Sequence, residues 1–374
     1  MEGVGCSIVY KSRGLGSFLG LENLWIAFSG YWPERGASLQ TGTFKELEVW
    51  GVLSRIRDDD TRVLVVASAG NTASAYARIC SESGMRCLII VPAQGLTRMH
   101  LDCAIGGPVK IVSLTQGADY TDAIHFAQAV SRHHAFLPEG GVRNVGRRDG
   151  MATAILSAVE AMSTLPDYYF QAIGSGTGAI AAHQAFKRLL CDSRFGHNVP
   201  RLMLGQNSPF APVFHSWRRQ SSQLVECNRT EARRLSRRIL ASVLSNQAPA
   251  YSIKGGIFEA LTESRGDVFA VTNRKLRRAM RLFERREGID IDPAAGVAVA
   301  SLLQAIASQR IATNAAVLLH ITGGGYSKMP VSAERTHPVP DIEIPLSAVN
   351  QKASLLRVWN SFEETGPFPP RTAG

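Results

Sequence analysis

The stretch Thr41-Gly42-Thr43-Phe44-Lys45-Glu46-Leu47-Glu48 places one lysine where a glycine-containing turn meets an apolar segment, predicted to be a helix over 45–56. The field at a helix N-terminus favours the neutral form of an amine, and burial acts in the same direction. A neutral lysine amine can act as a nucleophile and as a base. The stretch therefore predicts a reactive Lys45, although the same pattern also fits a surface lysine that starts an amphipathic helix.

Two glycine-rich loops follow this stretch along the chain. Ser68-Ala69-Gly70-Asn71-Thr72 places an asparagine beside a glycine, and Gly174-Ser175-Gly176-Thr177-Gly178 comes between a predicted strand and a predicted helix. Backbone N–H groups at such a junction converge on a phosphate, and small residues let the chain approach it closely. A lysine, an asparagine and a phosphate-binding loop in this order predict a pyridoxal-phosphate site.

A dinucleotide-binding loop is the competing interpretation of the second loop. Its spacing tolerates Ala179 at the sixth position. However, the loop follows several strand–helix units, and no acidic residue ends the next strand, Leu202-Met203-Leu204-Gly205-Gln206. We therefore favour a smaller phosphorylated cofactor.

Strand and helix patterns alternate from residue 44 to about 205. The predicted strands are 62–67, 87–91, 109–112, 135–137, 169–173 and 201–204, and the further predicted helices are 71–84, 97–105, 119–133, 151–162 and 179–190. This alternation is typical of parallel sheets flanked by helices, whose ligands bind beyond the carboxyl ends of the strands. We expect an α/β fold with two domains that face a common crevice: a small domain at 49–156, and a large one from 1–48 and 157–374.

The remainder of the chain adds one candidate. Residues 209–312 are predicted to be mostly helical, and the proline-rich tail after Pro330 is expected to wrap the surface. Between them a predicted strand at 315–320 leads into Ile321-Thr322-Gly323-Gly324-Gly325. A hydroxyl from Thr322 would leave a pyridine nitrogen unprotonated, which favours elimination and replacement over transamination. Thr322 also fits a turn that caps a strand.

Composition narrows the class of protein. The chain has 374 residues, 45% hydrophobic and 19% charged, as in ordinary globular proteins. No apolar run approaches the roughly 20 residues that span a bilayer, and the N-terminal residues lack a signal-peptide layout, so we expect a cytoplasmic protein without membrane contact. The net charge of +10 comes largely from the runs 233–238 and 274–278. Their hydrophobic residues recur at helical spacing, so we interpret them as solvated helix faces rather than nucleic-acid sites.

The six cysteines predict no metal site, because none of them forms a CxxC pair. Cys80 and Cys87 are expected to be small buried hydrophobic residues.

These motifs resemble those of fold-type II pyridoxal-phosphate enzymes, with the tryptophan synthase β-like fold, of the threonine synthase group. Within this group the chain is most similar to the cysteate synthases. The matching segments are 41–48, 65–78, 87–96, 137–151, 174–182 and 321–325. Threonine synthases usually read Asp-Arg where this chain has Glu46-Leu47.

The resemblance implies a role for each motif. Lys45 would form the Schiff base, Asn71 would bind the ring oxygen of the cofactor, and Thr322 would face its ring nitrogen. The cofactor phosphate would be held by Gly174, Ser175, Gly176, Thr177 and Gly178. The substrate carboxylate would be bound by Ser68, Ala69, Gly70 and Thr72. The implied reaction is a β-replacement that makes L-cysteate from O-phospho-L-serine and sulfite. A homodimer is also expected, since dimers are common among such folds.

A basic segment after Glu139 contains Arg143, Arg147 and Arg148. Guanidinium groups bind small oxyanions through a planar fork. We therefore predict that at least one of them binds the leaving phosphate or the incoming sulfite, although a solvated loop with Asp149 as a helix cap fits the pattern too. Three alternatives stay open for the whole chain: a threonine synthase, another β-replacement or β-elimination enzyme on phosphorylated or hydroxy amino acids, and a non-catalytic cofactor-binding or regulatory protein.

Overall fold

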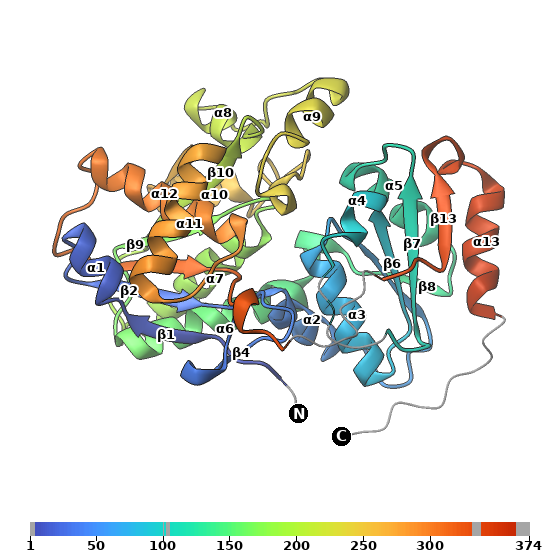
Figure 1. Ribbon diagram of the computed structural model, residues 1–374, viewed down its shortest axis with the longest axis horizontal. Coiled ribbons are helices and arrows are strands. Elements are labelled where there is room, and N and C mark those ends of the chain that lie inside the picture. Colours follow the sequence, from blue (N-terminus) through green and yellow to red (C-terminus); the bar gives the residue numbers. More distant parts are fainter. Residues whose placement is uncertain (1–3, 100, 102–104, 331–337, 364–374) are drawn as a thin grey trace. The chain divides into compact units, whose positions relative to one another are not determined.

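The computed structural model describes residues 4–99, 101, 105–330 and 338–363 (Figure 1). The chain divides into two units. Unit 1 comprises Met1–Val4, Glu48–Arg147 and Pro330–Gly374, and unit 2 comprises Gly5–Leu47 and Arg148–Met329. The chain passes from one unit to the other at four points, two of which lie within helices, α2 (Lys45–Leu53) and α6 (Val145–Met162).

Unit 1 is built on a five-stranded parallel sheet in the order β13-β7-β6-β5-β8. Its strands are β5 (Val63–Ala67), β6 (Cys87–Pro92), β7 (Val109–Thr115), β8 (Phe136–Pro138) and β13 (Ile342–Pro345). Its helices are α3 (Asn71–Ser83), α4 (Ala93–Leu96), α5 (Tyr120–Val130) and α13 (Lys352–Glu363). Apolar side chains pack on both faces of the sheet, as the short β-branched strand segments predict. Cys80 and Cys87 are fully buried there, so their predicted hydrophobic role is confirmed.

Unit 2 contains a six-stranded sheet in the order β1-β2-β12-β9-β10-β11, in which only the β1–β2 pair is antiparallel. Its strands are β1 (Ile8–Lys11), β2 (Leu24–Phe28), β9 (Tyr168–Ala172), β10 (Arg201–Ser208), β11 (Asp267–Thr272) and β12 (Val317–Ile321), and a separate ribbon pairs β3 (Tyr31–Trp32) with β4 (Ala37–Ser38). Its further helices are α1 (Gly14–Leu19), α7 (Thr177–Asp192), α8 (Pro212–Arg218), α9 (Arg229–Ser236), α10 (Ile257–Glu263), α11 (Asn273–Glu287) and α12 (Pro293–Ala307).

The basic run at 274–278 lies on α11, as the helical spacing predicts. Leu276, Ala279 and Phe283 are buried on one face of this helix, whereas Arg277 and Arg278 are exposed. The strand β11 was not predicted, because it lies inside the region 209–312, which was predicted to be mostly helical.

The chain after Pro330 differs from the expected surface wrap. Within it, β13 pairs in parallel with β7 (Figure 1). Val358 and Phe362 of α13 are buried in the core of unit 1. This segment was assigned to the large domain at the sequence level, whereas its contacts group it with unit 1, because strand pairing across sequence leaves no local signal. The predicted division at 49–156 otherwise remains a prediction.

Two predicted helices also differ. The described residues of 97–105 are not helical, and the single helical turn α4 comes before them. The helix predicted at 151 begins at Val145, so Arg147 and Arg148 lie in a first helical turn and not in a loop. In the described part of the chain, no helix is both long and apolar enough to cross a membrane.

Candidate active site

The lysine segment is bonded to the loop that follows β12. Thr43 forms an antiparallel bridge with Gly323, and the N–H of Phe44 donates to the carbonyl of Thr322 at 3.0 Å. The N–H of Gly324 donates to the carbonyl of Gly42 at 2.9 Å. This pairing brings the backbone of Lys45, the first residue of α2, close to that of Thr322, the two residues expected at opposite ends of a cofactor ring.

Glu46 closes the turn in front of the lysine. Both the N–H and the hydroxyl of Thr41 donate to its carboxylate, the hydroxyl at 2.8 Å, and the Glu46 side chain is buried. A buried carboxylate that accepts two donors holds the turn rigidly. The sequence identified Glu46 only as a departure from a family pattern, so this anchoring role was missed.

The glycine loop ends at the N-terminus of α7, which begins at Thr177. Gly176 has φ +87°, a left-handed conformation, and a Cβ there would lie 2.1 Å from Cδ1 of Ile257. The hydroxyls of Ser175 and Thr177 are 3.0 Å apart. The first-turn N–H groups of any helix have no partner within it; in α7 that of Thr177 donates to Oγ of Ser175 at 3.4 Å, and those of Gly178 and Ala179 would be available to an anion.

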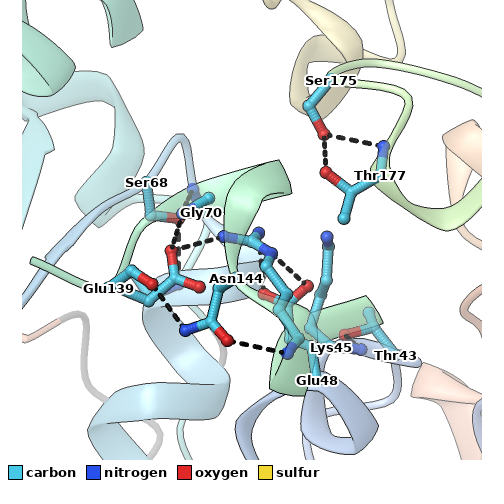
Figure 2. Close-up of polar contacts among 12 residues, drawn as sticks. Thr43, Lys45, Glu48, Ser68, Gly70, Glu139, Asn144, Ser175 and Thr177 are labelled. Atoms are coloured by element: carbon cyan, nitrogen blue, oxygen red, sulfur yellow. Dashed lines mark hydrogen bonds and ion pairs between the residues drawn. The ribbon is translucent and has the colours of Figure 1, made fainter. Parts of the chain in front are cut away.

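These groups fit the phosphate and the aldehyde of pyridoxal phosphate. Figure 2 shows the Lys45 side chain extending toward Thr177. Phe44 connects the lysine segment with the glycine loop, because its ring would lie 3.1 Å from a Cβ placed on Gly178. Unit 2 thus brings together an amine, a glycine loop at a helix N-terminus and the Thr322 loop. The loops after β9 and β12 share one edge of the sheet, since these strands are parallel neighbours.

Unit 1 carries the predicted substrate loop at the carboxyl end of β5. The hydroxyl of Ser68 accepts from the N–H groups of Gly70 at 3.1 Å and Ala73 at 2.9 Å, which shapes the entry into α3. Asn71 and Thr72 are the first two residues of that helix. The Ser68 hydroxyl is therefore an internal acceptor that keeps its own proton to donate, and carboxylate binding by this loop, Ala69 included, would use hydroxyls and the backbone N–H groups other than that of Gly70.

The three arginines have different surroundings. Arg143 is exposed in a 3-10 turn after β8. The N–H of Arg147 donates to the side chain of Asn144 at 3.3 Å, so this capping bond comes from Asn144 and not from Asp149, the cap in the alternative solvated-loop interpretation. Nε of Arg148 donates to Gln184 at 3.0 Å, and Asp149 pairs instead with Arg188.

Arg147 is the centre of a buried ion-pair cluster. Its guanidinium is 2.9 Å from Oε1 of Glu48 and 2.7 Å from Oε2 of Glu139. Burial would lower the pKa of Arg147, but the two carboxylates outweigh it and raise this pKa above its ordinary value. Figure 2 shows Glu139 and Asn144 among these contacts, and the Asn144 side chain also donates to the Glu139 carbonyl at 2.6 Å. Neither glutamate was singled out from sequence, although Glu48 stands out as an acidic residue at the edge of an apolar helical run.

In unit 1 the β5 and β8 loops share one edge, because the two strands pair in parallel. The predicted carboxylate loop and Arg143 therefore follow neighbouring strands of one sheet.

Comparison with known proteins agrees with this arrangement. The family model described as pyridoxal-phosphate dependent enzyme matches residues 27–323. The cysteate synthase of Methanocella paludicola is 42% identical over 91% of this chain and 81% of its own length. The cysteate synthase of Methanosarcina barkeri is 39% identical over 93% of this chain and 83% of its own length.

Solved structures show the same fold at low identity. Maize serine racemase has a TM-score of 0.66 at 14% identity, covering 96% of this chain and 94% of its own. The processed form of a threonine deaminase from Solanum lycopersicum has a TM-score of 0.58 at 17% identity, covering 87% of this chain and 87% of its own. The predicted α/β fold class and the pyridoxal-phosphate cofactor are confirmed. The chain belongs to the family of pyridoxal-phosphate dependent enzymes and, within it, to the cysteate synthases.

Proposed function

We propose that this protein catalyses a β-replacement in which O-phospho-L-serine and sulfite give L-cysteate and phosphate. In this reaction the bond from Cβ to the phosphate oxygen breaks and a bond from Cβ to the sulfite sulfur forms. The Cα proton is removed before the phosphate leaves and is returned after sulfite adds. The proposal rests on the relatives named above and on the chemistry that the described residues can perform.

Pyridoxal phosphate, when bound, supplies the electron sink that makes the Cα proton of an amino acid acidic. Lys45 would hold the cofactor through its amine and, once displaced by the substrate amine, would take the Cα proton and return it. The first-turn amides of α7 would hold the cofactor phosphate. The N–H groups of the 68–72 loop would orient the substrate carboxylate.

The observation that carries the proposal is the bonding of the lysine segment to the Thr322 loop, with both in the unit that contains the glycine loop. A hydroxyl-bearing residue at the ring nitrogen, where other enzymes place a carboxylate, favours replacement chemistry.

The role of Lys45 is tested by borohydride trapping. We expect Lys45→Ala to lose both the visible absorbance and the cofactor retained covalently after reduction. Lys328→Ala, at an exposed lysine of unit 2 paired with Glu34, is the control and should retain both. Covalent trapping in Lys45→Ala would assign the attachment to another lysine.

The substrate is tested by product analysis of the holoenzyme. We expect cysteate and phosphate in equal amounts from O-phospho-L-serine with sulfite, and no comparable turnover of serine. Threonine from O-phosphohomoserine, or pyruvate from phosphoserine whether or not sulfite is present, would favour the synthase or the elimination alternative instead. No turnover of any of these by enzyme with bound cofactor would favour the non-catalytic alternative.

The anion contact is assigned in this proposal to Arg143, because Arg147 is already bound to two carboxylates and Arg148 to Gln184. Among the described residues no ion-pair partner of Arg143 is present. Loss of a charge-assisted hydrogen bond costs ~1.5–3 kcal/mol, so Arg143→Ala should lower kcat/KM for phosphoserine or sulfite by roughly 10- to 150-fold. Arg132→Ala is the matched control, since this exposed arginine precedes β8 where Arg143 follows it. Near-normal kinetics of Arg143→Ala would place the anion contact elsewhere.

Two narrower expectations belong to the same proposal. We propose a homodimer, to be checked by light scattering after gel filtration, and a cytoplasmic location, to be checked by cell fractionation.

A further inference from the structure

A hydrogen-bonded chain of four buried side chains crosses the sheet of unit 2. Oγ of Ser29 is 3.0 Å from Nε2 of His320, Nδ1 of His320 is 2.8 Å from the hydroxyl of Tyr169, and that hydroxyl donates to Oε1 of Gln171 at 2.9 Å. The exposed fractions of these side chains lie between 0% and 2%. They come from the end of β2, from β12 and from β9, and none of them was singled out from the sequence.

The protons in this chain have one consistent arrangement. Burial lowers the pKa of His320 to about 3, so its ring is neutral and has one donor and one acceptor nitrogen. The single proton of the Tyr169 hydroxyl is given to Gln171, so the Tyr169 oxygen accepts from Nδ1–H of His320. Nε2 is then the acceptor for Ser29. Every hydrogen bond therefore points toward Gln171.

The hydrogen-bonded chain ends at the glycine loop. Oε1 of Gln171 is bonded to Tyr169, and Nε2 lies 2.4 Å from the position that a Cβ on Gly178 would take. The carboxamide of Gln171 thus occupies the space that a side chain at position 178 would need, and it packs against the first turn of α7. Gly178 is required here for close approach and not for its backbone conformation.

The hydrogen-bonded chain also contacts the lysine segment. The ring of Phe44 packs edge-on against His320, with 5.6 Å between ring centroids. Phe44 precedes Lys45, and its ring is also the neighbour of Gly178 noted above. The two segments expected to hold the aldehyde and the phosphate of the cofactor therefore rest on one buried network.

We propose that Gln171, held by Tyr169 and His320, is a positioning residue that keeps the glycine loop in the conformation that binds the cofactor phosphate. This inference rests on the proposed function only for the binding of pyridoxal phosphate and is independent of the substrates. Because the network supports the phosphate loop, its loss should weaken binding of the phosphorylated cofactor selectively.

The test compares the affinity for pyridoxal phosphate with that for pyridoxal, which lacks the phosphate, by dialysis and absorbance. Tyr169→Phe leaves Oε1 of Gln171 and Nδ1 of His320 without their partner. We expect its Kd for pyridoxal phosphate to rise about tenfold, as for one lost buried hydrogen bond, and its Kd for pyridoxal to stay within about twofold. Gln171→Met should show the same selectivity. His320→Asn keeps a donor near Nδ1 and should bind pyridoxal phosphate more tightly than His320→Leu.

Ser301→Ala is the matched control. Its fully buried hydroxyl donates to the carbonyl of Val297 at 2.9 Å within α12, in the same unit and outside the network. Equal weakening of pyridoxal and pyridoxal phosphate in Tyr169→Phe and Gln171→Met, or unchanged binding of both, would overturn the proposal. If Tyr169→Phe fails to fold, Gln171→Met alone decides the matter, since the same two affinities are measured. Absence of cysteate formation would count against the proposed function and would leave these binding results valid.

Discussion

Arg147 shows how the partners of one side chain decide its role. Its basic segment predicts an oxyanion contact, yet its guanidinium is enclosed by Glu48 and Glu139, which are themselves buried. A guanidinium that neutralises two carboxylates inside a protein has little attraction left for a phosphate. Glu48 and Arg147 lie at the points where the chain passes between the units in α2 and α6, which favours a structural role for the cluster.

We predict that Arg147→Met is strongly destabilising. Removing one partner of a buried ion pair leaves uncompensated charge, which typically costs ~3–5 kcal/mol in the free energy of unfolding. Arg188→Met is the control, because it breaks the more exposed pair with Asp149, and exposed pairs are worth ~0–1 kcal/mol. Urea unfolding of the two variants measures the difference. A small effect in both would show that the cluster does not stabilise the fold.

The buried His320 should make the free energy of unfolding depend on pH. Its pKa in the folded protein is about 3, against an ordinary value of 6.5. Below pH 6.5 the unfolded chain takes up a proton that the folded protein does not, so stability should fall with decreasing pH until about pH 3. The slope from this one group is at most ~1.4 kcal/mol per pH unit.

The measurement is the free energy of unfolding at pH 7.5, 6 and 5, compared with His320→Gln, which removes this titration and leaves the other groups in place. The difference between the two proteins should change with pH in the stated direction. Parallel pH profiles would show that the imidazole is protonated in the folded state as readily as in the unfolded one.

Among the elements, the 174–178 loop needs a left-handed backbone conformation at Gly176. Gly176 combines φ +87° with a Cβ position only 2.1 Å from Ile257, so alanine is disfavoured by strain and by overlap. We predict that Gly176→Ala weakens binding of pyridoxal phosphate at least as strongly as Tyr169→Phe does. Gly196→Ala is the control, since Gly196 also has a positive φ but no atom within 4 Å of its Cβ position. Equal cofactor affinity of the two variants would argue against a phosphate contact at this turn.

The pairing of β13 with β7 gives a second prediction for an element. Deleting residues 340–374 removes an edge strand and exposes the apolar side chains that Val358 and Phe362 cover in unit 1. We expect lower thermal stability and faster amide hydrogen exchange in β7. Deletion of residues 364–374 alone is the control. Unchanged exchange in β7 after the longer deletion would contradict the pairing.

For the whole molecule, the proposed cofactor contacts fall in one unit except for that of Asn71, which belongs to unit 1. Lys45, the 174–178 loop and Thr322 all belong to unit 2. A ligand at 100 times its Kd stabilises the folded state by ~2.7 kcal/mol, so pyridoxal phosphate should slow hydrogen exchange, first in the start of α7 and in the 322–325 loop. Exchange slowed elsewhere but not in these two segments would place the cofactor at a different site.

The sequence alone determined the fold class, the family and the order of the motifs. Strand and helix periodicities are local, so 62–67, 71–84 and 87–91 correspond to β5, α3 and β6 within one residue. The helix predicted from residue 119 begins there for the same reason, because Asp119 caps α5 and its side chain accepts from the N–H groups of Thr121 and Asp122. The individual roles of Lys45, Asn71 and Thr322 remain predictions.

The tertiary structure decided what depends on residues far apart in the chain. The enclosure of Arg147 by Glu48, the pairing of β13 with β7, and the chain from Ser29 through His320 to Gln171 join positions that no sequence window contains. A buried polar group must find its partner wherever the packed core provides one, because leaving it unpaired costs more than the bond itself contributes. Local pattern therefore predicts which residues carry chemistry, and packing decides which of them are free to perform it.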